Sequence, residues 1–307
     1  MKKIFVSKSV HIHAPAEDIF PKLNDFHEWP KWSPWLLQEP EATVDVAEDG
    51  KSYSWQGQRV GSGEMSVISE TNNEYLNCDL TFLTPYKSKA KTAFKLRPKD
   101  GGTEVTWTMD SSLPFFMFWM KKSMVAFIGS DYDRGLSMLK DLVEKGQVPS
   151  HLTFKGESDY AGCQYIGIKT DCTIDKVGKK MQADFASLEG YVKENGDNIT
   201  GVPFSIYHKW DLVKKNVSYS AAVPVKNLPT PLPAGMYSGE IPATRIYTLR
   251  HTGTYAHLGN AWTTLYGMQR AKSFKVKKGI HPFETYVNMP GAVADEELIT
   301  DINFAVQ

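Results

Sequence analysis

The sequence predicts a two-domain α+β protein, in which a curved antiparallel sheet wrapped on a long helix is followed by a duplicated βαββ module. Three observations support this prediction. The chain has 307 residues, about twice the length of an ordinary domain. Residues 51–110 alternate apolar and polar positions in short runs separated by Gly, Asn and Pro, a pattern typical of antiparallel strands. A Pro-Phe-x-x-Tyr sequence at 203–207 recurs 79 residues later, at 282–286, which indicates an internal duplication.

The first half is predicted to contain a strand, a short helix, a strand meander and a long helix. Alternating apolar residues at 4–12 share one face of an extended segment, and Pro15 then suits the first turn of a helix. One helix must cover the concave face of the sheet, and such a fold usually encloses a cavity. Trp29, Trp32 and Trp35 would line the mouth of that cavity or plug it. The closing helix carries one apolar stripe: Ile128, Tyr132, Leu136, Leu139 and Val143.

Further short segments characterise this half: residues 14–20, 32–35, 55–57 with 60–63, 102–107 and 131–136. Together they resemble the SRPBCC family, the START-like and polyketide cyclase-like helix-grip proteins. The resemblance covers about residues 1–147 and implies a helix-grip fold with a cavity for a small molecule. It implies no particular reaction, because this fold hosts unrelated chemistries.

The second half follows a short polar connector at 144–150, so we expect domains at 1–147 and 155–307. In this second half, the predicted order strand, helix, strand, strand occurs twice, over about 158–224 and 243–306. Strand alternation places Ser205 with Tyr207 on one face, and Glu284 with Tyr286 on one face of the equivalent strand. We expect the intervening phenylalanines, Phe204 and Phe283, to lie under the helices. The tyrosines and Glu284 would then face a groove between the repeats.

A carboxylate among aromatic rings is suited to holding an organic cation. Burial would also raise the pKa of Glu284, so an acid–base role stays open. The segments 201–211, 251–255 with 261–262, 283–286 and 297–302 resemble the GyrI-like effector-binding domain of AraC- and MerR-type regulators. The resemblance covers about 155–307 and implies a ligand pocket with Glu284 as its carboxylate. It implies an aromatic lining from Tyr207, Tyr255 and Tyr286, with Glu297 and Trp262 as further lining residues.

Composition excludes several classes of protein. Residues 1–150 hold eighteen basic and twenty acidic residues, and 151–307 hold seventeen and fifteen, so neither half has the basic excess of a nucleic-acid binder. The three cysteines lack CxxC spacing and fit a reducing cytoplasm. His11 and His13 have no third ligand at a supporting spacing, so we expect no metal, and nothing requires a cofactor.

We also expect no membrane partner. The start of the chain lacks a signal-peptide pattern. The most apolar stretch, Leu113 to Met120, is interrupted by Lys121 and Lys122 well short of the roughly 20 residues that a membrane span needs. A cytoplasmic location follows as an expectation.

These observations predict a small-molecule binding protein of the effector-binding type, without a DNA-binding domain of its own. Its ligand would be hydrophobic, amphipathic or cationic. The alternative is a hydrolase of small electrophilic compounds that uses Glu284 and Tyr255. The resemblance to the GyrI-like domain implies this alternative, because some members of that family hydrolyse such compounds with a glutamate and a tyrosine. A third possibility makes the first domain a protein-interaction module, which would require an exposed apolar patch on it. The protein partner and the oligomeric state are not predicted.

Overall fold

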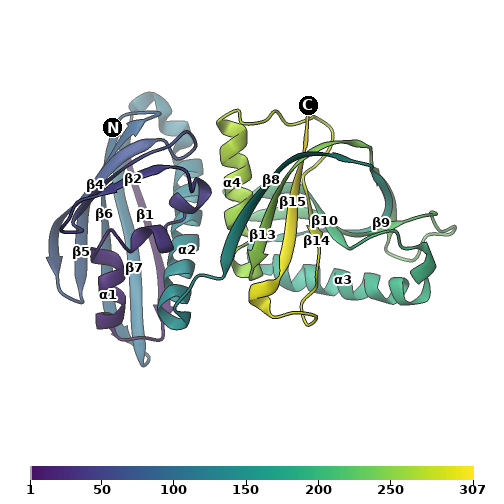
Figure 1. The fold of residues 1–307 in the computed structure, drawn as a ribbon, viewed down its shortest axis with the longest axis horizontal. Helices are drawn as coiled ribbons and strands as arrows, with labels where there is room; N and C mark the ends of the chain where they lie inside the picture. Colours follow the sequence, from purple (N-terminus) through teal and green to yellow (C-terminus); the bar gives the residue numbers. More distant parts are fainter. Residues whose placement is uncertain (1) are drawn as a thin grey trace. The chain divides into compact units, whose positions relative to one another are not determined.

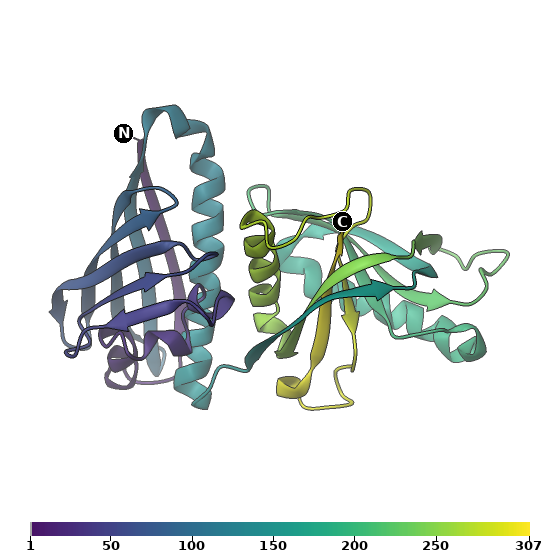
Figure 2. The ribbon, with the colours of Figure 1, turned by 45° about the horizontal axis from the view of Figure 1, so that its top comes forward.

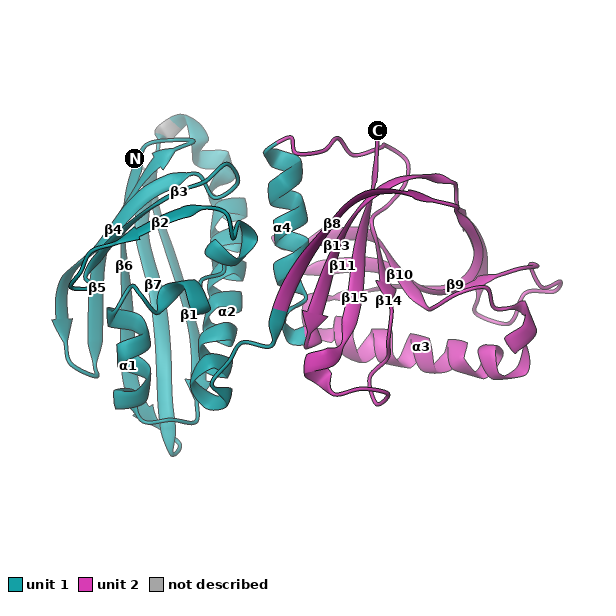
Figure 3. Ribbon diagram, viewed as in Figure 1, with its two compact units in different colours: residues 1–150, 256–271 teal, residues 151–255, 272–307 magenta. Residues whose placement is uncertain are grey.

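The computed structural model describes residues 2–307 and divides the chain into two compact units (Figure 3). Unit 1 comprises residues 1–150 and 256–271, and unit 2 comprises 151–255 and 272–307. Within the described residues, unit 1 is built on a seven-stranded antiparallel sheet and unit 2 on an eight-stranded one. The predicted α+β class is therefore confirmed.

Unit 1 has the predicted order of elements (Figure 1). Its sheet runs β1-β7-β6-β5-β4-β3-β2, so that the first and last strands along the chain lie next to each other. The elements are β1 (Lys2–Ile12), α1 (Ala16–Asn24), η1 (Trp29–Lys31), η2 (Leu36–Gln38), β2 (Thr43–Val46), β3 (Ser52–Gln56), β4 (Ser62–Thr71), β5 (Tyr75–Thr84), β6 (Ser88–Lys99), β7 (Gly102–Leu113), η3 (Phe115–Met120) and α2 (Lys121–Lys145), with α4 (Gly259–Arg270) from the second half.

Helix α2 packs against the sheet of unit 1 through the stripe that its sequence predicts. Tyr132, Leu136 and Leu139 are each 2% exposed or less. The helix ends at Gly146, whose φ of 76° is the left-handed conformation that glycine adopts without strain. The N–H of this glycine donates to the Leu142 carbonyl at 3.0 Å and closes the last turn.

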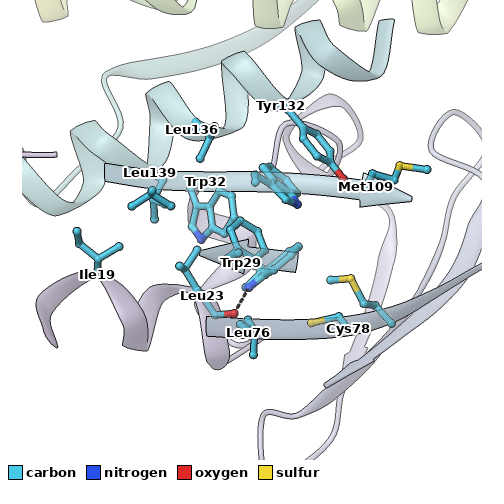
Figure 4. Close-up of a cluster of buried hydrophobic side chains, with 14 of the residues drawn as sticks. Ile19, Leu23, Trp29, Trp32, Leu76, Cys78, Met109, Tyr132, Leu136 and Leu139 are labelled. Atoms are coloured by element: carbon cyan, nitrogen blue, oxygen red, sulfur yellow. Dashed lines mark hydrogen bonds between the residues drawn. The ribbon is translucent and has the colours of Figure 1, made fainter. Parts of the chain in front are cut away.

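Aromatic side chains fill the space between the sheet and α2. Trp107 of β7 stacks on Tyr132 with ring centroids 3.9 Å apart and donates its indole N–H to Thr92 Oγ1 at 2.7 Å. Trp29 and Trp32 are both 1% exposed, and Figure 4 shows them between α1 and the helix that carries Leu136. They therefore act as a plug rather than as the mouth of a cavity.

A buried carboxylate fixes the loop between β3 and β4. Glu39 is 3% exposed and accepts backbone N–H bonds from Gln58, Arg59 and Val60 at 2.8–2.9 Å. Burial alone would raise the pKa of Glu39, but these three donors outweigh it and hold the pKa below its ordinary value of 4.5.

We expect Glu39→Gln to destabilise unit 1 by about 2 kcal/mol at neutral pH, because an amide N–H₂ would face backbone donors. A lowered folded-state pKa means that the ionised form stabilises the fold above the unfolded-state pKa. This stabilisation is lost as the pH falls through the folded-state value. The difference between wild type and variant should therefore shrink below about pH 4 in urea titrations followed by circular dichroism. A pH-independent difference would contradict this account.

Unit 2 confirms the predicted duplication. Its sheet runs β12-β9-β11-β10-β14-β15-β13-β8, and the two central strands, β10 and β14, carry the repeated Phe-x-x-Tyr sequence. We call the boundary between β10 and β14 the seam. On each side of the seam, one repeat supplies three strands that are consecutive neighbours in the sheet (Figure 2). The elements are β8 (Ser150–Tyr160), β9 (Cys163–Thr173), η4 (Ile174–Lys176), α3 (Val177–Glu194), η5 (Gly196–Asn198), β10 (Phe204–Asp211), β11 (Asn216–Val225), β12 (Tyr237–Ile241), β13 (Thr244–Gly253), η6 (Tyr255–His257), β14 (Phe283–Tyr286), η7 (Asp295–Glu297) and β15 (Ile299–Val306).

The expected placement of the two sheet faces was wrong. Phe204 and Phe283 belong to a core cluster that also holds Tyr165 and Ile206, on the face away from α3. The face with Tyr207 and Tyr219 is the one that α3 covers, through Leu188 and its neighbours. Alternation shows which side chains share a face, but nothing in a strand's own sequence says which face receives the helix.

Helix α4 makes polar contacts within unit 1. His257, in the turn before it, is 1% exposed with its Nε2 2.7 Å from Asp141 Oδ2 of α2. Asn260 accepts a hydrogen bond from Arg134 at 2.7 Å. Among residues 2–307, no helix combines the length and the apolarity that crossing a membrane requires.

Candidate functional site

Glu284 lies at the seam of the unit 2 sheet, where it is the register partner of Ser205 on β10. Its side chain is 1% exposed. One carboxylate oxygen, Oε2, accepts hydrogen bonds from the hydroxyls of Tyr286 at 2.7 Å and Tyr207 at 3.0 Å. Ser205 Oγ lies 3.0 Å from the Tyr286 hydroxyl. The structure therefore brings together three of the residues that the sequence singles out. Tyr207 comes from β10 of the first repeat, and Glu284 and Tyr286 come from β14 of the second repeat.

Burial and the Glu284 charge together raise the pKa values of Tyr207 and Tyr286 well above their ordinary value of 10. Both hydroxyls therefore keep their protons at neutral pH and donate to the carboxylate. The result is a buried carboxyl group that accepts hydrogen bonds from two tyrosine hydroxyls. An ionised carboxylate is unfavourable in a protein interior unless hydrogen bonds or a counter-charge compensate it.

Helix α3 covers this cluster from one side. The sulfur of Met181 lies 3.4 Å from the Tyr286 hydroxyl, and the ring of Phe185 packs edge-on against Tyr286 with centroids 5.4 Å apart. A second carboxylate, Asp184, accepts hydrogen bonds from Tyr219 at 2.6 Å and from Thr170 at 2.8 Å. The cluster is thus bordered by a thioether, a phenyl ring and a second acid from a single helix.

A β-bulge adds another aromatic residue at the edge of the cluster. The pairing of β10 with β11 shifts by one residue between Tyr207 and Lys209. Without this shift, Tyr207 and Trp210 would point to opposite faces, because they are three positions apart. The ring of Trp210 instead lies 5.9 Å from that of Tyr207, and its side chain is 43% exposed.

The remaining predicted residues lie in different environments. Tyr255 begins the short 3-10 helix η6 and is 38% exposed, with its ring 5.9 Å from that of Tyr286. Burial and the Glu284 charge raise the pKa of Tyr255 to about 12. Glu297 is exposed in η7, and Trp262 is in α4 of unit 1, stacked on Tyr266. The structure thus groups Tyr255 with the trio but does not place Glu297 or Trp262 in it.

The sequence reasoning missed Asp184, Tyr219 and Trp210. The sequence pattern could have indicated Asp184 as a site residue, because a carboxylate beside the apolar stripe of an amphipathic helix must find polar partners. No local signal exists for Trp210, since its position depends on the bulge. Among the described residues, no group of three or more His, Cys, Asp or Glu side chains could hold a metal ion.

Comparison with solved structures gives partial similarities. A cryo-EM structure of an EcmrR–DNA complex is 16% identical over 61% of this chain and 68% of that chain, with a TM-score of 0.44. Protein MLL2253 from Mesorhizobium loti is 15% identical over 46% of this chain and 97% of its own, with a TM-score of 0.36. Aha1 from Colwellia psychrerythraea is 17% identical over 47% and 98%, with a TM-score of 0.35. We draw no functional conclusion from these similarities.

A search of curated proteins found no match. Two protein families match the sequence, one in each half. The polyketide cyclase / dehydrase and lipid transport family matches residues 3–144. The GyrI-like small molecule binding domain matches residues 161–307 and includes the whole Glu284 cluster. The chain therefore joins a domain of the polyketide cyclase, dehydrase and lipid transport family to a domain of the GyrI-like small-molecule binding family.

Proposed function

We propose that unit 2 binds a small organic cation with aromatic or aliphatic groups, and that Glu284 supplies the counter-charge. The observation that carries the proposal is the buried carboxylate oxygen of Glu284, which two tyrosine hydroxyls contact at 2.7 and 3.0 Å. The faces of aromatic rings attract cations. A cation that is shielded from water is attracted to a neighbouring carboxylate more strongly than a solvent-exposed cation is. The description of the GyrI-like family as small-molecule binding supports the proposal.

The ligand would reach Glu284 by displacing side chains that now cover it. Of the eighteen residues of α3, only Leu188 is fully buried, while Val177, Met181, Phe185, Tyr191 and Val192 are partly buried against the sheet, so an outward movement of this helix would expose apolar area together with the Glu284 cluster. Tyr255 and Trp210 flank the buried trio and are both about two-fifths exposed. They would form the rim of the opened site, while Tyr207 and Tyr286 would turn their rings toward the ligand.

Isothermal titration calorimetry of the full chain tests this proposal. The ligands are an aromatic quaternary ammonium ion and its neutral isostere, in which carbon replaces the charged nitrogen. We expect the cation to bind at least about tenfold more tightly, since the two ligands differ only in the charge that faces Glu284. Equal affinities, or binding of neither compound, would overturn the proposal.

A hydrolase is the second candidate, and Tyr255 favours it. This tyrosine is partly exposed beside a buried carboxylate, and its pKa of about 12 makes it a proton donor at neutral pH. Turnover separates the two functions, because a binding protein consumes no substrate. Repeated hydrolysis of p-nitrophenyl acetate that is lost in both Glu284→Gln and Tyr255→Phe would establish the hydrolase. We expect no such turnover.

A further inference from the structure

Five large apolar side chains lie exposed at one end of the unit 1 sheet, and we call them the apolar tip: Leu83, Tyr86, Phe116, Phe118 and Trp119. Three of them, Tyr86, Phe116 and Trp119, are 70–77% exposed. Isolated exposed apolar residues are ordinary on protein surfaces, but a group of large aromatic ones indicates a contact surface.

Two segments that are distant in sequence form the apolar tip. Leu83 lies near the end of β5 and Tyr86 in the turn that leads to β6, whereas Phe116, Phe118 and Trp119 lie in η3, directly after β7. Strands β6 and β7 are antiparallel neighbours, with Ala90 opposite Ser111. The beginning of β6 and the end of β7 therefore share one end of the sheet, so the hairpin and η3 leave it side by side.

Basic residues predominate around the apolar tip. Residues 80–91 contain Lys87, Lys89 and Lys91 and no acidic residue. Residues 111–130 contain Lys121 and Lys122 and again no acidic residue. Lys87 follows Tyr86 directly and Lys89 lies two positions further along, and both are exposed. Aromatic residues bordered by lysines match the interface of an anionic bilayer, where rings enter the headgroup region and ammonium groups stay near the phosphates.

We propose that the apolar tip docks unit 1 on the surface of anionic membranes. Charge complementarity argues for a bilayer rather than a protein partner, because protein interfaces are depleted in lysine relative to the rest of the surface. The expectation of no membrane partner was based on the absence of a spanning segment, and an interfacial contact needs none. The same stretch, Leu113 to Met120, is too short to span a bilayer but long enough to lie in its interface.

Vesicle sedimentation with the full chain tests the proposal. The vesicles contain phosphatidylcholine alone or an equal mixture of phosphatidylcholine and phosphatidylglycerol. We expect binding to the mixed vesicles only. Phe116→Ser combined with Trp119→Ser should weaken binding on the order of tenfold or more. Lys121→Gln combined with Lys122→Gln should weaken it by about fivefold for each lysine removed.

The matched controls make the same types of change at the other end of β5 and β6. Tyr75 and Lys95 are exposed register partners there, and Tyr75→Ser and Lys95→Gln should leave vesicle binding unchanged. Quenching by brominated lipids gives an independent readout. It should reduce the tryptophan fluorescence of the wild type and lose most of its effect in Trp119→Phe, because Trp119 is the indole expected to enter the bilayer.

Three outcomes would overturn the proposal. The first is no binding of the wild type to either kind of vesicle. The second is equal binding by the tip variants and the control variants. The third is a concentration-dependent dimer in light scattering that Phe116→Ser with Trp119→Ser abolishes, because the apolar tip would then be an interface between two copies of this chain.

Discussion

Glu284→Gln is expected to weaken the binding of an aromatic quaternary ammonium ion on the order of 100-fold, or about 2.7 kcal/mol, while the neutral isostere binds as before. The amide is nearly the same size and keeps one carbonyl oxygen that can accept from the Tyr207 and Tyr286 hydroxyls. The fold should therefore survive, and the loss should measure the charge alone. Calorimetry with both ligands on the wild type and the variant gives this difference directly.

The control is Glu296→Gln, the same substitution at an exposed glutamate of η7. We expect it to leave both affinities unchanged, because an exposed charge is screened by water and salt. A Glu284→Gln variant that keeps full affinity for the cation would show that the carboxylate is a structural acceptor for the two tyrosines and not part of a ligand site.

Trp107→Ala is expected to destabilise unit 1 by about 4 kcal/mol. Trp107 is 1% exposed, stacks on both Tyr132 and Phe94, and donates its N–H to Thr92. Its removal would leave a large cavity in the middle of the aromatic cluster. Urea denaturation followed by circular dichroism measures the effect, with the unfolding of unit 1 analysed as its own transition.

Trp119→Ala is the matched control for the stability experiment. The side chain removed is the same, but it is 70% exposed, so we expect a change within about 0.5 kcal/mol. If Trp107→Ala cost less than about 1 kcal/mol, the interior of unit 1 would have to be loosely packed or hollow, contrary to the ring contacts described above.

The order of elements could be predicted because strands and helices show their periods locally. The stripe from Ile128 to Val143 defines α2, and the repeated Phe-x-x-Tyr sequence identifies β10 and β14 as equivalent strands. Two edge strands of unit 2, β8 and β12, were not predicted. None of the β8 side chains is fully buried, and β12 follows a proline-rich segment, so neither has the clear apolar alternation of an inner strand.

The candidate site could be predicted in part for the same reason. Glu284 and Tyr286 share a face because they are two positions apart on one strand, and the duplication places Tyr207 at the equivalent point of the other repeat. Trp210 could not be predicted, because a one-residue bulge reverses the face of every side chain that follows it.

Periodicity and residue type in the sequence are therefore sufficient to predict the two sheets, the long helix α2, the duplication and the acidic and phenolic residues of the seam. The folded chain adds that α3 covers the Glu284 face, that rings fill the interior of unit 1 and that five apolar side chains gather at one end of its sheet. These features depend on contacts between residues far apart in the chain, and a local pattern carries no information about such contacts.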